Sequence, residues 1–140
     1  MNYIEDAVKL FEGGYRCSQA VFAAFSPDFE LSKEQALKIG ACFGSGMRKG
    51  EVCGACTGAL MVLGLKYGES KAKSDEVCDE FLDEFKKDNG SYICRELLGC
   101  DISTQKGVEY AKDNNLFRDL CPKMVESAAK ITKEILFTNE

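Results

Sequence analysis

The sequence predicts an all-α fold, a single-domain bundle of about six helices around a central apolar helix. Apolar residues recur at spacings of three and four along most of the 140 residues, whereas no window alternates as a β-strand does. The links between these segments are short and no internal repeat is present. With 45% hydrophobic and 29% charged residues, the chain can bury a sizeable core, so one domain is expected over residues 1–140.

Three helices are expected before residue 41. The first covers residues 3–11 and ends at the glycine pair 13–14, because consecutive glycines stop a helix. The second begins near Cys17 and ends before Pro27, whose ring cannot continue it. Ser32 and Gln35 have the spacing of a capping box, which predicts the start of the third helix.

Residues 40–54 contain five glycines, too many for a helix interior, so a tight loop is expected there. The next helix should cover about 53–67 and is apolar on nearly all sides, which makes it the expected central helix. The uncharged run 52–65 has 14 residues. This is shorter than the roughly 20 residues that span a bilayer, so we expect no membrane insertion.

Three more segments complete the predicted bundle. A helix should start at Ser74, with acidic residues in its first turn, and end near Asn89. A short helix over 93–98 follows, and residues 100–115 are polar enough to be irregular. The last helix should cover about 117–135, where apolar residues again repeat at three and four.

The absence of histidine excludes several kinds of site. With 0 His, the chain cannot form a Ser-His-Asp or Cys-His catalytic site, a cysteine-histidine zinc finger or a His-ligated haem. The net charge of −5, without a basic stripe, argues against a nucleic-acid partner. Two acidic residues near the N-terminus do not fit a signal peptide, so a cytoplasmic location with reduced thiols is expected.

The most specific local motif is Cys53-Gly54-Ala55-Cys56, at a predicted loop-to-helix junction. The positive end of a helix dipole stabilises a thiolate in the first turn, and two thiols three residues apart lie on one face. Cys53 and Cys56 are therefore candidate catalytic thiols, with Cys53 as the nucleophile. A thioredoxin-like fold is not expected, because the chain lacks the strands of a βαβ unit.

The segments YRCSQAV (15–21), FGSGM (43–47), CGACTGALM (53–61), CRELLG (94–99) and CP (121–122) together resemble the C_GCAxxG_C_C family, which is named for suspected redox activity. The resemblance extends in order over about residues 1–137. It implies that the family's four recurring cysteines correspond to Cys17, Cys53, Cys94 and Cys121. Cys56 falls on a variable position of the family motif.

The positions of these four cysteines favour a shared site. Cys17, Cys53 and Cys94 open predicted helices, and Cys121 lies within the first two turns of the last one. Converging helix N-termini would stabilise thiolates collectively. The resemblance therefore implies a cofactor or metal site at these four cysteines, with an iron–sulfur cluster as one form and reversible thiols as another. A related segment in split-Soret-type cytochromes, which carry an iron–sulfur centre, favours the cluster.

A non-catalytic module is the alternative function. Four thiolates without imidazole also suit zinc or another soft metal ion, although intervals of 35, 40 and 26 residues differ from those of ordinary zinc fingers. The sequence leaves open whether the chain is an oxidoreductase or an electron carrier, which redox partner it has, and whether it forms a homodimer. Cys42 and Cys78 are expected to pack in the core, and the loop at 44–49 resembles an anion-binding loop without the P-loop spacing.

Overall fold

A computed structural model describes residues 2–138 of the chain, and within this range the fold is all-α. The eight α-helices of this range are α1 (Tyr3–Glu12), α2 (Cys17–Phe25), α3 (Lys33–Ile39), α4 (Gly54–Tyr67), α5 (Lys71–Asn89), α6 (Cys94–Leu98), α7 (Gln105–Asp113) and α8 (Leu116–Thr138). Short helical turns cover η1 (Ser26–Phe29), η2 (Gly40–Cys42) and η3 (Gly46–Gly50). The described residues form no strand, only an isolated antiparallel bridge between Val52 and Ile93.

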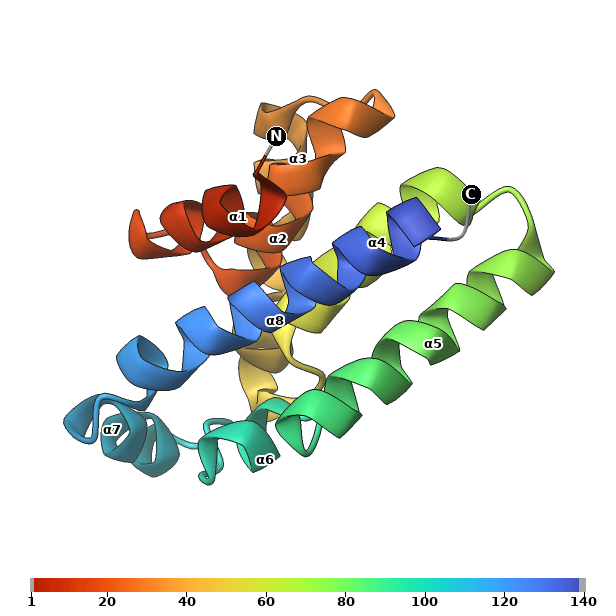
Figure 1. Cartoon of the computed structure of the whole chain (residues 1–140). Coiled ribbons are helices and arrows are strands. Elements are labelled where there is room, and N and C mark those ends of the chain that lie inside the picture. Colours follow the sequence, from red (N-terminus) through yellow and green to blue (C-terminus); the bar gives the residue numbers. More distant parts are fainter. Residues whose placement is uncertain (1, 139–140) are drawn as a thin grey trace.

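The long helix α8 organises the bundle. It runs across α1, α4 and α5, while α2 packs against both α1 and α4 (Figure 1). Phe25, Phe81, Phe85 and Leu63 are among the largest fully buried side chains between these helices. The short helices α6 and α7 lie together at one end of the bundle, next to the first turns of α8 (Figure 1).

The close approach of α2 and α4 depends on two glycines of α4. A Cβ atom added at Gly54 would lie 2.5 Å from the Cys17 sulfur, and one at Gly58 would lie 2.5 Å from the Ser18 carbonyl oxygen. Neither distance is compatible with ordinary van der Waals contact. The spacing of four residues puts both glycines on one face of α4, so this face admits the first turn of α2.

Two boundaries differ from the sequence-based expectation. Helix α5 starts at Lys71 and not at Ser74, because the Ser70 side chain accepts a hydrogen bond from the Lys73 N–H and caps the helix one turn earlier. The expectation of an irregular segment after residue 100 was wrong for α7. There the Thr104 side chain accepts from the Gly107 N–H, and Ala111 is completely buried. The count of about six helices was therefore too low.

Helix α4 is buried from Gly54 to Ala59 along most of its surface, and Val62 and Leu63 continue this burial. Near its C-terminal end Leu65 is exposed. None of the helices over residues 2–138 combines the length and the apolar character needed to cross a membrane.

Candidate functional site

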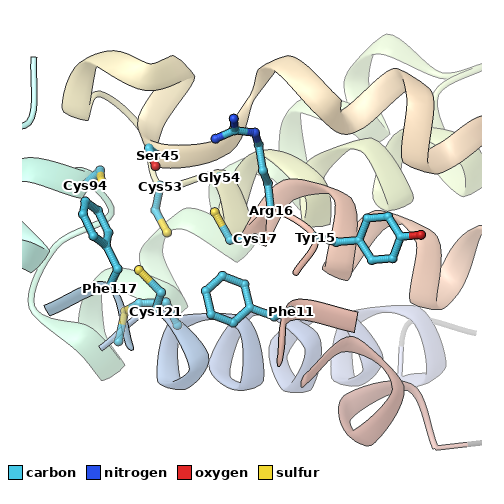
Figure 2. A pocket seen from close by; sticks show the side chains of 11 residues that line it. Phe11, Tyr15, Arg16, Cys17, Ser45, Cys53, Gly54, Cys94, Phe117 and Cys121 are labelled. Carbon is cyan, nitrogen blue, oxygen red and sulfur yellow. The ribbon is translucent and has the colours of Figure 1, made fainter. Parts of the chain in front are cut away.

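Four cysteines from four separate segments line one cavity of about 200 Å³. They are Cys17, Cys53, Cys94 and Cys121, and the first three are buried. Figure 2 shows the sulfur atoms of Cys17, Cys53 and Cys121 directed into the space between the rings of Phe11 and Phe117. The packing of the helices therefore brings together residues that are more than a hundred positions apart in the chain.

The beginnings of helices position these thiols. Cys17 is the first residue of α2, Cys53 is the N-cap residue of α4, and Cys94 is the first residue of α6. Cys121 lies in the second turn of α8, directly before Pro122. Cys53 and Cys94 are also tied together through the backbone, because the Cys53 N–H donates to the Tyr92 carbonyl and the Cys94 N–H donates to the Glu51 carbonyl.

Among the four cysteines that line the cavity, only Cys53 has a lowered pKa. The Cys56 thiol donates a hydrogen bond to the Cys53 sulfur, and this bond lowers the pKa of Cys53 although burial acts in the opposite direction. The backbone N–H groups of Ala55 and Cys56, in the first turn of α4, donate to the same sulfur. A thiolate at this position thus receives three donors, which is the arrangement that favours the charged form.

The other three thiols of the cavity favour the neutral form. Burial, followed by repulsion from Cys53, raises the pKa of Cys17 to about 11. Burial and repulsion from Cys53 and Cys17 raise the pKa of Cys94 to about 12. The pKa of Cys121 is raised as well, first by burial and then by the charges of the other three thiols. The four groups are close enough to interact, and one negative charge among them opposes a second.

A loop with left-handed backbone, around residues 45–48, contacts the Cys17 sulfur. Ser45, Met47 and Arg48 have φ values of 55°, 55° and 66°, which cost roughly 1–2 kcal/mol for each residue that carries a side chain. From this loop the Ser45 N–H donates to the Cys17 sulfur, as do the N–H groups of Cys17 and Ser18, and these bonds lower its pKa in part. Strained backbone of this kind concentrates at functional sites.

Apolar side chains form much of the cavity wall, and the neighbouring residues Tyr15 and Arg16 also line it. Phe11, Phe117 and Met124 contribute to the lining together with the cysteines. Tyr15 lines the cavity, but Figure 2 shows its hydroxyl group directed away from the sulfur atoms. A second cavity of about 170 Å³ shares Cys53, Cys94, Cys121 and Met124. These four residues therefore line both cavities.

The four remaining cysteines lie outside this cavity. Cys56 is completely buried beneath Cys53, and burial followed by its hydrogen bond to Cys53 raises its pKa. The expectation that Cys42 packs in the core was wrong, because it is exposed at the end of η2. Cys78 is half-buried on α5, and the Cys100 thiol donates to the Gly107 carbonyl at 3.7 Å.

Sequence reasoning did not identify Phe11, Phe117 and Met124 as part of the site. Each looks like an ordinary core residue of a helical stripe, and only the packing of α1 against α8 brings Phe11 to the cysteines. Ser45 belongs to the glycine loop that the sequence singled out. It acts on Cys17 through its backbone N–H, and because every residue except proline has this group, the residue type could not predict the contact.

Fold and site together define an all-helical protein in which four cysteines from separate segments line one cavity. Across residues 2–138, no three Cys, Asp or Glu side chains are arranged, as they lie, to hold a metal ion. The chain belongs to the C_GCAxxG_C_C family, described as putative redox-active proteins, whose model matches residues 15–135. Comparisons with curated proteins and with solved structures gave no match.

Proposed function

We propose that this chain is a cytoplasmic redox protein whose centre is the four-cysteine cavity, and that it passes electrons to or from a partner molecule. The convergence of Cys17, Cys53, Cys94 and Cys121 on one cavity carries the proposal. Isolated buried cysteines pack as small hydrophobic residues, whereas here four cysteines from separate segments line the same cavity. The family description points in the same direction.

In the thiol form of the centre, the Cys53 thiolate attacks a disulfide of the partner. A bond forms between Cys53 and one partner sulfur, and the other partner sulfur leaves and takes up a proton. A second thiol, Cys56, which already contacts Cys53, then attacks Cys53 and releases the remaining partner thiol. The partner gains two electrons, and the two protein thiols become a disulfide. The lowered pKa of Cys53 favours this form.

In the metal form, the same cavity holds an iron–sulfur cluster through Cys17, Cys53, Cys94 and Cys121. The donor set fits in kind, because four thiolates are the usual ligands of such clusters, although among residues 2–138 the side chains as they lie form no site for a single metal ion. A bound cluster would supply one-electron transfer. The backbone N–H groups that donate to Cys17 and Cys53 are the kind of donors that tune cluster potentials.

A bound cation would change the charge state of the four thiols. Without a cation the pKa values of Cys17 and Cys94 stand near 11 and 12, so these groups are protonated at neutral pH. A positively charged centre would attract the thiolate forms and deprotonate the thiols outright. Zinc would meet the same requirement without redox activity, and this is the non-catalytic alternative.

The deciding experiment is purification without oxygen, followed by measurement of iron, acid-labile sulfide, zinc and the visible absorption spectrum. Bound iron and sulfide with absorption in the visible range identify the metal form. Colourless, metal-free protein whose thiols cycle with dithiothreitol identifies the thiol form. One equivalent of zinc, unfolding on chelation and no electron transfer would establish the alternative.

Single Cys→Ser variants at positions 17, 53, 94 and 121 locate the centre, and Cys78→Ser is the matched control because Cys78 lies on α5, outside the cavity. In the metal form we expect each of the four variants to lose the colour. In the thiol form we expect Cys53→Ser to abolish the thiol cycling. The control should keep both. If the four variants fold and behave like the control, the cavity is not a redox centre.

A further inference from the structure

A basic cleft adjoins the cysteine cavity. It has a volume of about 300 Å³ and shares Arg16, Ser45 and Phe117 with the cavity. Its other lining residues come from the left-handed loop, from the segment before α7 and from α7 itself. Because of these shared residues, the cleft lies directly beside the cysteine cavity.

Three positive side chains meet in this cleft, although the protein is acidic overall. Arg16 precedes α2, Arg48 lies in the left-handed loop, and Lys112 lies on α7. Across residues 2–138, no ion pair engages any of the three, whereas nearby Arg95 pairs with Glu51 at 3.1 Å and Arg118 pairs with Asp119 at 3.0 Å. Segments distant in the sequence thus bring together three positive charges with no carboxylate partner.

The remaining wall of the cleft is apolar. Ile102 is buried, and Val108 and Phe117 are half-buried. A site with cations on one side and apolar groups on the other matches a ligand that has an anionic group and an apolar body, because each part meets its favourable surroundings. An inorganic anion alone would leave the apolar wall unused.

We propose that the basic cleft binds a small organic dianion, with a phosphate monoester as the best match. The phosphate lies among Arg16, Arg48 and Lys112, and the apolar body lies against Ile102 and Phe117. Binding does not require the thiols to react. The role of such a ligand as substrate or effector of the cysteine centre rests on the proposed function, through the shared Arg16 and Phe117.

The test is an NMR titration of ¹⁵N-labelled protein with phenyl phosphate at low salt. We expect saturable shifts of the Ser45, Arg48 and Lys112 amides, weaker binding of inorganic phosphate, and none of phenol. Isophthalate, a dicarboxylate of similar shape, distinguishes recognition of phosphate from recognition of any dianion. If phenyl phosphate and isophthalate both bind saturably, the cleft is an organic-dianion site that is not selective for phosphate.

Charge variants separate the cleft from the overall charge of the protein. In Arg48→Gln/Lys112→Gln we expect phenyl phosphate to bind at least tenfold more weakly. The matched control is Lys49→Gln/Lys106→Gln, which removes the same charge from the same loop and the same helix at exposed positions outside the cleft; its affinity should stay within twofold. Absence of saturable shifts, or an equal loss in both double variants, overturns the proposal. Because no thiol reaction is read, this result is independent of the redox test.

Discussion

Helix α4 contains two interior glycines whose replacement by alanine should have opposite effects. A Cβ atom at Gly58 meets the Ser18 carbonyl oxygen at 2.5 Å and the Phe22 nitrogen at 3.3 Å, whereas one at Gly64 has no neighbour within 4 Å. In Gly58→Ala the backbones of α2 and α4 must separate until the closest distance reaches ordinary contact near 3.4 Å. Forcing extra atoms into a packed interior costs roughly 1–3 kcal/mol. Alanine regains up to about 1 kcal/mol of helix propensity at both positions.

We therefore expect Gly58→Ala to lower the free energy of unfolding by about 1–2 kcal/mol and Gly64→Ala to raise it by up to about 1 kcal/mol. Urea denaturation of the reduced protein, followed by circular dichroism at the helical band, measures both. The m-values should be unchanged, so that the midpoints report stability. If Gly58→Ala is as stable as Gly64→Ala, the close approach of α2 and α4 does not depend on this glycine and the reasoning fails.

Three further predictions concern the site and its support. In metal-free, reduced protein the raised pKa values of Cys17 and Cys94, about 11 and 12, stabilise the fold below the unfolded pKa near 9, and this contribution is lost as the pH rises. The free energy of unfolding, measured in urea at pH 9 and 10, should fall between these two pH values by roughly 1 kcal/mol for each of the two thiols, because the unfolded thiol is only half ionised at pH 9. Cys17→Ser should remove the contribution of Cys17 to this decrease. Met47→Gly should raise the thermal midpoint, because Met47 is exposed and its left-handed backbone costs roughly 1–2 kcal/mol against about 0.5–1 kcal/mol for glycine entropy; Lys49→Gly, without that φ, should lower it. Ser18→Ala removes a buried hydroxyl that donates to the Gly40 carbonyl at 2.7 Å and should cost about 1 kcal/mol in urea denaturation; an unchanged midpoint would show that this bond contributes nothing.

Local signals in the sequence were sufficient for most helices. Ser32 caps α3 as predicted, since its side chain accepts from the Gln35 N–H, although the Gln35 side chain bonds the Ser32 hydroxyl and so completes no reciprocal capping box. Helices α1, α2 and α4 end at Gly13, Ser26 and Gly68. These features depend on neighbours within one turn, which a single sequence displays. The positions of Cys17, Cys53 and Cys94 at the N-termini of helices could be predicted for the same reason.

The parts that could not be predicted depend on tertiary contacts. Helix α7 has few apolar residues, and its buried Ala111 becomes informative only when α8 lies beside it. Exposure of Cys42 follows from η2 turning its side chain outward, which no composition rule reveals. Left-handed backbone at Met47 and Arg48 is also outside sequence rules, because neither residue type favours it. The gathering of four cysteines was inferred from the family resemblance and helix starts, whereas their aromatic surroundings were not.

The cavity joins an early and a late part of the chain, since Cys17 belongs to α2 and Cys121 to α8. During synthesis Cys17, Cys53 and Cys94 therefore leave the ribosome before Cys121, and the cavity is incomplete until α8 docks. Any centre that uses all four cysteines must follow that docking, whereas a disulfide between Cys53 and Cys56 would not depend on α8. Until then the unprotected sulfur atoms of a nascent chain depend on the reducing capacity of their surroundings.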